Sequence, residues 1–317
     1  MATGITIYGC EPDEAVLFRE MAPRCGVAPT FVEEPVSAEN AALAFGNRCV
    51  SVGHKTRVTQ SVLEALSRAG VRYVSTRSIG VDHIDVEFAA SVGIEVGNIA
   101  YSPDSVADFT VMLALVLLRD VRSVLRRADL HDYRLGTRGR ELRDLTVGVI
   151  GTGRIGVAVT DRLRGFGGCV VAHDSRPRNS ADYLPLDELL RVSDVVTLHT
   201  PLNAGTHHLL DRDRIALMKP GAFVINTGRG PLIDTKALVE ALESGRMGGA
   251  ALDVLEGEEG IFYTDCRARE IDLDTLVRLR GMPNVVITPH TAYYTDHALS
   301  DTVENTLVNC VSFGGTA

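Results

Sequence analysis

The chain has 317 residues, of which 45% are apolar and 23% charged, so it carries enough apolar material for a globular core. Its 32 basic and 41 acidic residues give a formal net charge of −9. Sequence-independent binding to nucleic acid and binding to anionic membrane surfaces both need a basic face. We therefore expect neither nucleic acid nor a membrane among its partners.

No segment resembles a membrane span or a secretory signal. The longest uninterrupted apolar run, residues 111–118, is far shorter than the roughly 20 residues that cross a bilayer. The first residues lack the basic and apolar regions of a signal peptide. The six cysteines lie far apart and form no C-x-x-C pair, which disfavours a disulfide framework and a zinc site. We expect reduced thiols, a cytoplasmic location and no bound metal.

Short β-branched runs alternate with helical patterns along the chain. We expect strands at 4–9, 49–53 and 71–77, with helices at 13–21 and 60–69 between them. The same rhythm resumes with strands expected at 146–151, 169–174, 194–200, 222–228, 248–254 and 284–290. A long apolar helix is expected from Val106 to about Ala128, buried between subunits or domains.

This repeated alternation predicts an α/β protein with two doubly wound, parallel-sheet, Rossmann-like domains and an active-site cleft between them. The segment after the last strand is long enough to return to the first domain. We expect a discontinuous first domain, 1–100 plus 297–317, and a second domain, 101–296.

A phosphate-binding motif opens the second domain. Gly151, Gly153 and Gly156 form a G-x-G-x-x-G pattern, directly after an apolar strand and at the start of an amphipathic helix. The next strand ends at Asp174, which completes the fingerprint of a dinucleotide-binding fold. The free N–H groups at the helix N-terminus, which begins near Arg154 and Ile155, would bind the pyrophosphate.

Asp174 is the main determinant of which dinucleotide is expected. Its carboxylate would accept hydrogen bonds from the adenosine ribose and repel a 2′-phosphate, which favours NAD(H) over NADP(H). Arg176 and Arg178 follow at once and could offset that repulsion, although a solvated loop is the simpler interpretation. NADP(H) therefore stays open as an alternative cofactor.

Three polar residues lie just beyond expected strands of the second domain: Arg229, Glu258 and His290. Ligands of open parallel sheets bind at the carboxyl ends of the strands, so all three point to one crevice. A single Arg, Glu or His at a strand end is more often a surface residue. Glu256 and Glu259 flank Glu258, and spacing alone does not choose among them.

The motifs RSIGVDHID, GTGRIG, VTLHTPLN, INTGRGPLID, ALDVLEGE and PHTAYYT together resemble the D-specific 2-hydroxyacid dehydrogenases. PHTAYYT is similar to the D-lactate dehydrogenase branch, and STRSIG, AYSPDSVAD, INTGRGPL and AALDVLEGEE are similar to its VanH-type enzymes of vancomycin resistance. The similarity runs from residue 5 to residue 310.

The resemblance implies roles for matching residues. His290 would be the acid/base, suited to that task because imidazole titrates near neutral pH. Glu258 would pair with it and favour the protonated imidazolium, so that a proton is available for reduction of a ketone. Arg229 would bind the substrate carboxylate through its planar fork. The backbone N–H groups of Ser78, Ile79 and Gly80 would bind the same carboxylate from the first domain.

The resemblance also implies contacts around the cofactor and the substrate side chain. Tyr101 and Tyr293 match positions that close over the side chain, which favours a small group and hence pyruvate; ordinary packing is an equal alternative for each. Asp253 would lie near the nicotinamide carboxamide. A homodimer built on the cofactor domains is expected. His290 is implied to contact the cofactor as well. The remaining cofactor-lining residues implied are His199, Thr200, Pro201, Thr206, Thr227 and Gly228.

The leading hypothesis is therefore an NAD-dependent D-lactate dehydrogenase that reduces pyruvate and supplies D-lactate for D-alanyl-D-lactate peptidoglycan precursors. One alternative is an enzyme of the same fold with another 2-oxo acid substrate. A second alternative comes from another class: an NAD(H)-binding, corepressor-like scaffold, because a fold does not fix a function.

Overall fold

The computed structural model describes residues 3–177 and 182–315, so Arg178 lies outside the described residues. The chain divides into two compact units. Unit 1 comprises Met1–Ser102 and Tyr294–Ala317, and unit 2 comprises Pro103–Tyr293. Unit 1 is therefore assembled from both ends of the chain, whereas unit 2 is continuous.

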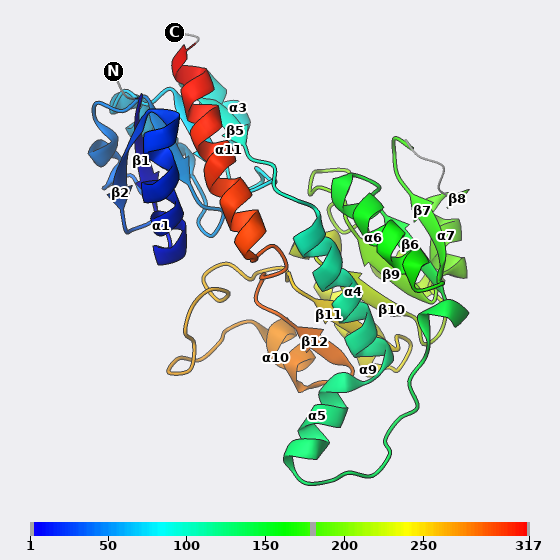
Figure 1. The fold of residues 1–317 in the computed structure, drawn as a ribbon. Coiled ribbons are helices and arrows are strands. Elements are labelled where there is room, and N and C mark those ends of the chain that lie inside the picture. Colours follow the sequence, from blue (N-terminus) through cyan, green and yellow to red (C-terminus); the bar gives the residue numbers. More distant parts are fainter. Residues whose placement is uncertain (1–2, 178–181, 316–317) are drawn as a thin grey trace. The chain divides into compact units, whose positions relative to one another are not determined.

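Unit 1 is built on a five-stranded parallel sheet in the order β2-β1-β3-β4-β5. Helices α1 and α11, which come from opposite ends of the chain, lie side by side (Figure 1). The strands are β1 (Thr3–Tyr8), β2 (Val27–Val32), β3 (Cys49–Val52), β4 (Tyr73–Thr76) and β5 (Glu95–Asn98). The helices are α1 (Pro12–Met21), α2 (Gln60–Arg68), α3 (Val86–Ser91) and α11 (Asp296–Gly315), with short 3-10 turns at Ala22–Cys25 and Ala41–Ala44.

Successive residues of the central strands pack into different apolar clusters, one on each face of the sheet. Cys49 and Tyr73 join the cluster that contains Val303 and Leu307 of α11. Their neighbours Val50 and Val74 join the cluster that contains Leu63 and Leu66 of α2. This alternation follows from the two-residue period of a strand, and it means that both faces of the sheet are covered.

Unit 2 is built on a seven-stranded parallel sheet in the order β12-β11-β10-β9-β6-β7-β8. The strands are β6 (Thr146–Ile150), β7 (Cys169–His173), β8 (Asp182–Tyr183), β9 (Val195–Leu198), β10 (Phe223–Asn226), β11 (Gly249–Leu252) and β12 (Val285–Ile287). The helices are α4 (Asp104–Leu118), α5 (Val121–Asp129), α6 (Arg154–Gly165), α7 (Leu186–Val192), α8 (Arg212–Leu217), α9 (Thr235–Glu243) and α10 (Asp274–Gly281), with 3-10 turns at Leu142–Asp144 and Gly230–Leu232.

The two all-parallel sheets confirm the expected fold class. Three strands were not anticipated: β2, β5 and β8. Each lies at the edge of its sheet, where a strand needs less apolar sequence. Pro29 interrupts the pattern of β2, which an edge position tolerates because one side of that strand makes no ladder hydrogen bonds.

The expectation of one helix from Val106 to about Ala128 is wrong. The helix is interrupted at Asp120, whose φ of 49° is in the left-handed region, and a separate helix, α5, follows it. Helix α4 packs against α6 and against strands β10 and β11 of its own unit. Its apolar character is therefore explained by the core of unit 2.

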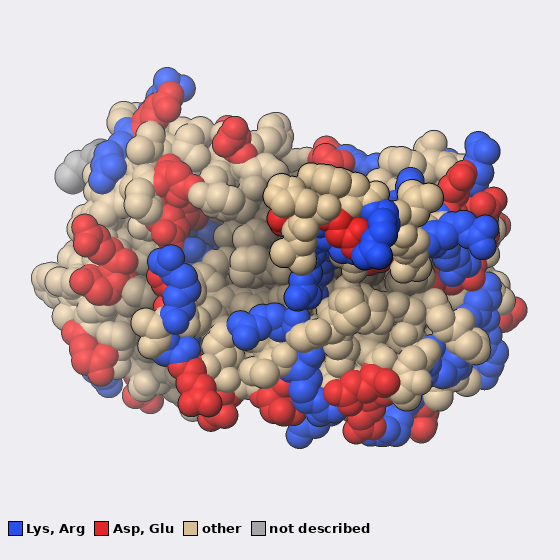
Figure 2. Space-filling model, turned by 90° about the horizontal axis from the view of Figure 1, so that it is seen from below, with Lys and Arg blue, Asp and Glu red and all other residues tan. Residues whose placement is uncertain are grey.

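The surface of the described residues carries side chains of both charges. Figure 2 shows acidic and basic side chains interspersed on the face that it draws, without a continuous basic patch there. Among the described residues, no helix combines the length and apolar character that a membrane crossing requires.

Candidate active site

The glycine motif forms the turn between β6 and α6. Gly151 has a φ of 90°, and a Cβ there would lie 2.6 Å from the carbonyl oxygen of His199. A Cβ on Gly156 would lie 1.9 Å from the carbonyl oxygen of Gly151, so these two positions cannot accept a side chain. A Cβ on Gly153 would meet no described atom within 4 Å. The loop is thus tightly packed on one side and open at the N-terminus of α6, as a pyrophosphate requires.

Asp174 follows β7 and faces the glycine loop. Its carboxylate accepts hydrogen bonds from the Thr152 N–H at 2.7 Å, the Thr152 hydroxyl at 3.0 Å and the Arg176 N–H at 2.8 Å. Desolvation by burial raises the pKa of Asp174, but these hydrogen bonds lower it by more, so its net pKa is below the usual value. The carboxylate is charged and keeps acceptor capacity for a ribose hydroxyl.

A second loop of unit 2 begins after β9. The hydroxyl oxygen of Thr200 is buried and has no hydrogen-bond partner among the described residues. Thr206 instead donates its hydroxyl to the Pro201 carbonyl at 2.7 Å and so stabilises the loop. Desolvation lowers the pKa of His199 far below its usual value, so this imidazole is neutral.

Arg229 lies in the turn after β10. The buried Asn226 shapes this turn, because its amide donates to the Arg229 carbonyl at 2.8 Å and accepts from the Gly228 N–H at 3.0 Å. Arg229 itself donates through Nη1 to the Gly228 carbonyl at 2.8 Å. Thr227, also buried, exchanges a hydrogen bond with Thr110 of α4. The sequence analysis missed Asn226, although a polar residue at the end of a buried strand was a visible signal.

His290 and Glu258 are in contact. His290 Nδ1 lies 2.6 Å from Glu258 Oε1, and both side chains are mostly buried, at 16% and 18% exposed. The other carboxylate oxygen of Glu258 accepts the Leu255 N–H at 2.6 Å, which fixes its orientation. Glu256, which the spacing could not exclude, pairs with His208 instead. Glu258 is therefore the acid that orients the imidazole.

His290 adopts an unusual backbone conformation, with a φ of 55°. Its N–H donates to the Asp253 carbonyl at 2.7 Å. The fully buried Asp253 carboxylate also accepts hydrogen bonds from the Thr288 hydroxyl, the Thr291 N–H and the Ala292 N–H. Asp253 thus holds the segment that carries His290, which explains how a strained residue persists there.

Two tyrosines of unit 2 surround His290. The ring of Tyr293 lies edge-on, with centroids 6.5 Å apart. The Tyr263 hydroxyl donates to the His290 carbonyl at 2.7 Å, and the two ring centroids are 5.9 Å apart. Desolvation raises the pKa of Tyr263 well above its usual value, so the phenol keeps the proton that it donates. Tyr263 was not among the residues expected from the sequence, whereas Tyr101, which was expected near the substrate, belongs to unit 1.

We predict that Tyr263→Phe lowers turnover severalfold and leaves the Michaelis constant for the substrate nearly unchanged. The substitution removes one hydrogen bond to the backbone of His290, worth about 0.5–1.5 kcal/mol, but no group that binds substrate. Steady-state kinetics check this, with Tyr8→Phe, which removes a tyrosine hydroxyl donated to the Asn40 carbonyl of unit 1, as the matched control. Equal kinetic constants in both variants would contradict the role.

In unit 1, the loop at Ser78, Ile79 and Gly80 follows β4. The Ser78 hydroxyl donates to the Gly80 carbonyl at 2.7 Å, which curls the loop. Among the described residues, the N–H groups of Ile79 and Gly80 have no hydrogen-bond acceptor. The preceding Arg77, only 4% exposed, donates to the Tyr8 and Gly9 carbonyls and pairs with Glu14. The loop thus presents two N–H groups that can bind an acceptor, and the hydrogen bonds of Arg77 anchor the residue before it.

Comparisons with known proteins identify the family of this chain. Residues 111–292 match the model of the "D-isomer specific 2-hydroxyacid dehydrogenase, NAD binding domain". A "D-specific alpha-keto acid dehydrogenase" of Enterococcus faecium is 57% identical, over 98% of this chain and 97% of its own. An "Aromatic 2-oxoacid reductase" of Clostridium sporogenes is 41% identical, over 98% of this chain and 96% of its own.

Among solved structures, a D-lactate dehydrogenase from Aquifex aeolicus, complexed with NAD and lactic acid, superposes with a TM-score of 0.89. It is 33% identical, and the match covers 98% of this chain and 96% of that one. The resemblance found in the motifs is thereby confirmed, together with the expected NAD cofactor and the expected enzyme class. The chain belongs to the D-isomer-specific 2-hydroxyacid dehydrogenases, a family of NAD-dependent oxidoreductases.

Proposed function

We propose that the enzyme reduces pyruvate to D-lactate with NADH. The observation that carries this proposal is the pairing of His290 with Glu258 at 2.6 Å, in the unit whose glycine loop is open for the cofactor. Support for the substrate comes from the relatives, which include a protein named "D-lactate dehydrogenase" of Lactobacillus delbrueckii, 36% identical over 95% of this chain.

The proposed mechanism assigns each polar residue one task. Gly151, Gly153, Gly156 and Asp174 would hold NADH, whose chemistry would be to supply the hydride that reduces the keto carbon. His290 donates a proton from Nε2 to the carbonyl oxygen, because Nδ1 is held by Glu258. Arg229 binds the substrate carboxylate, and the N–H groups of the loop at Ser78, Ile79 and Gly80 bind the same group.

The other contacts expected from the sequence are assigned in the same way. His199, Thr200, Pro201, Thr206, Thr227 and Gly228 would line the cofactor, with Arg154 and Ile155 at the start of α6. Asp253 would lie near the nicotinamide carboxamide, where its carboxylate holds the N–H groups of Thr291 and Ala292. Residues 1–100 plus 297–317 would form the substrate domain and 101–296 the cofactor domain. Tyr101 and Tyr293 would restrict the substrate to a small side chain.

The decisive experiment follows NADH oxidation by the purified protein with pyruvate, with a chiral assay of the product. Parallel reactions use 2-oxobutyrate and an aromatic 2-oxo acid, since the Clostridium sporogenes relative is named for aromatic substrates. D-lactate formation with the highest kcat/KM for pyruvate would support the proposal. A preference for the aromatic acid would select another substrate, and NADH binding without turnover on any 2-oxo acid would select a binding function.

Cofactor preference gives a separate prediction. We expect Asp174→Ala to raise the ratio of NADPH to NADH activity at least tenfold, because the charge that repels a 2′-phosphate is removed. The measurement is kcat/KM for both cofactors. The control is Asp161→Ala, which changes an exposed aspartate of α6. An unchanged ratio would show that Asp174 serves only to bind Thr152 and Arg176.

We further propose a cytoplasmic homodimer that supplies D-lactate to a ligase making D-alanyl-D-lactate precursors in vancomycin resistance. Support for self-association is the apolar surface on and after α5, where Leu125, Leu130, Tyr133 and Leu135 are mostly exposed. Sedimentation at micromolar concentration tests the dimer. Loss of vancomycin resistance on gene deletion, restored by added D-lactate, tests the pathway.

A further inference from the structure

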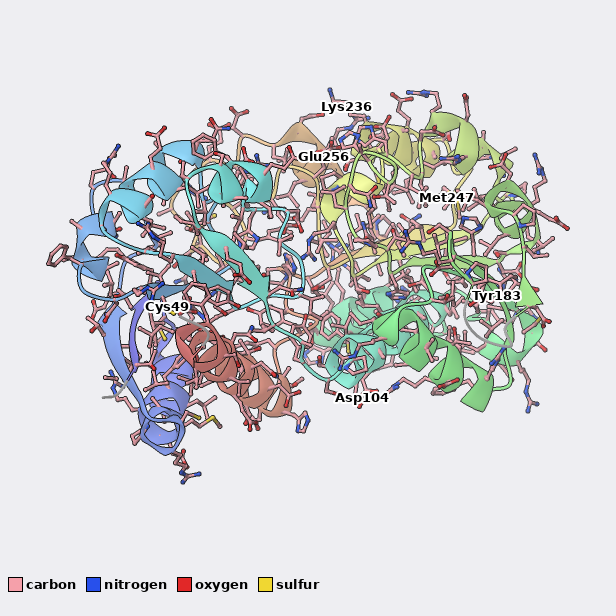
Figure 3. The ribbon with its side chains drawn as sticks, turned by 90° about the horizontal axis from the view of Figure 1, so that it is seen from above. Cys49, Asp104, Tyr183, Lys236, Met247 and Glu256 are labelled. Carbon is pink, nitrogen blue, oxygen red and sulfur yellow. The ribbon has the colours of Figure 1, made fainter. Side chains whose placement is uncertain are left out.

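A second cluster of ligating side chains lies outside the residues assigned to the reaction. His207 and His208 follow one another in the loop after β9, and Glu256 follows β11 (Glu256 is labelled in Figure 3). One ligand atom from each of the three lies within 4.8 Å of the other two. His208 Nε2 is 2.9 Å from Glu256 Oε1. Three residues from two distant segments thus converge on one point.

The backbone at His208 makes this convergence possible. Adjacent side chains normally point in different directions, but the φ of His208 is 48°, in the left-handed region. The two imidazole rings consequently stack, with centroids 4.0 Å apart and an interplanar angle of 28°. A left-handed conformation is unfavourable for a residue with a Cβ, and such conformations concentrate at functional sites.

The segments that carry the three side chains are anchored. The His208 N–H donates to the Pro231 carbonyl at 2.8 Å, and the Leu210 N–H donates to the Leu232 carbonyl at 3.0 Å. The same turn, Gly230–Leu232, also packs against the segment that carries Glu256. A Cβ on Gly230 would lie 2.4 Å from the backbone nitrogen of Glu256. A ligand would therefore find these groups already near one another.

We propose that His207, His208 and Glu256 bind one divalent transition-metal ion such as Zn²⁺ or Ni²⁺. Imidazole nitrogen with a single carboxylate is a donor set that suits these ions. Glu256 and His208 are each about one-third exposed and His207 is exposed, so an ion can enter and water can complete its coordination. This inference departs from the expectation of no metal, which rested on cysteine spacing, and it does not depend on the proposed reaction.

The test is calorimetric titration of the chelator-treated full-length protein with Zn²⁺, its thiols kept reduced. The wild type is expected to bind one equivalent that His207→Ala and Glu256→Gln each weaken at least about tenfold. His297→Ala, an exposed histidine paired with one carboxylate on α11, is expected to bind as the wild type does. Retained NADH binding in each variant shows that it is folded.

Two results would overturn the proposal. The first is a wild-type protein that takes up neither Zn²⁺ nor, in a repeat titration, Ni²⁺. The second is Zn²⁺ uptake that is equal in the wild type and in the His207→Ala and Glu256→Gln variants, which would place the ion on other groups such as the cysteines. In either case the cluster is a His208–Glu256 hydrogen bond with His207 stacked against it. Neither result bears on pyruvate reduction, because no turnover is measured.

Discussion

Replacing His290 with glutamine should lower turnover in pyruvate reduction by about 10²–10⁴-fold, the usual contribution of a positioned general acid. Glutamine retains a polar side chain of similar length but cannot deliver a proton to the developing alkoxide. Since Asp253 and Tyr263 hold the backbone of His290, the segment should keep its position in the variant. Single-turnover measurements at saturating NADH isolate the chemical step.

The matched control for this prediction is His297→Gln, which changes an exposed histidine of unit 1. Binding of NADH, measured by fluorescence, should be within severalfold of the wild type for both variants. Full turnover in His290→Gln would remove the imidazole as proton donor. The assignment of Glu258 as the residue that orients it would then lose its basis.

Replacing Arg229 with alanine should lower kcat/KM for pyruvate by about 10²–10³-fold, with effects on both kcat and KM. The guanidinium is proposed to bind the substrate carboxylate, and loss of one preorganised charged donor has effects of this size. Arg229→Lys should recover only part of the loss, because an ammonium keeps the charge but lacks the planar pair of donors.

Arg212→Ala is a suitable control for Arg229, since Arg212 is an exposed arginine of the same unit that pairs with Glu240. The turn itself should survive the substitution, because Asn226 holds it through the Arg229 carbonyl and the Gly228 N–H. A variant that retains the wild-type KM for pyruvate would show that the carboxylate is bound elsewhere. Steady-state kinetics over a range of pyruvate concentrations distinguish these outcomes.

The strands that the sequence predicted well are mainly apolar and β-branched. Strands β6, β9 and β10 have the sequences TVGVI, VVTL and FVIN, and such strands are typical of a parallel sheet covered on both faces. Edge strands such as β5, with the sequence EVGN, carry no such pattern, because only part of their surface is buried. The break at Asp120 also has no strong local signal, since the residue there is neither glycine nor proline.

At the site, residue types and the family resemblance pointed to Arg229, Glu258 and His290, and the structure brings Glu258 and His290 into contact. The sequence could not identify residues that act by their position. Tyr263 contacts His290 across 27 positions of the chain, and the pairing of His208 with Glu256 spans 48. Such contacts depend on the order of strands in the sheet, which local patterns do not contain.

The return of α11 to unit 1 has a consequence for synthesis on the ribosome. Val303, Leu307 and Cys310 of α11 complete the apolar cluster formed with Ile5 and Ile7 of β1. All of unit 2 is made before these residues emerge, so it can fold while unit 1 still lacks one covering helix. The segment translated first thus reaches its native packing last. Until then its central strands expose an apolar face that is a candidate site for chaperone binding.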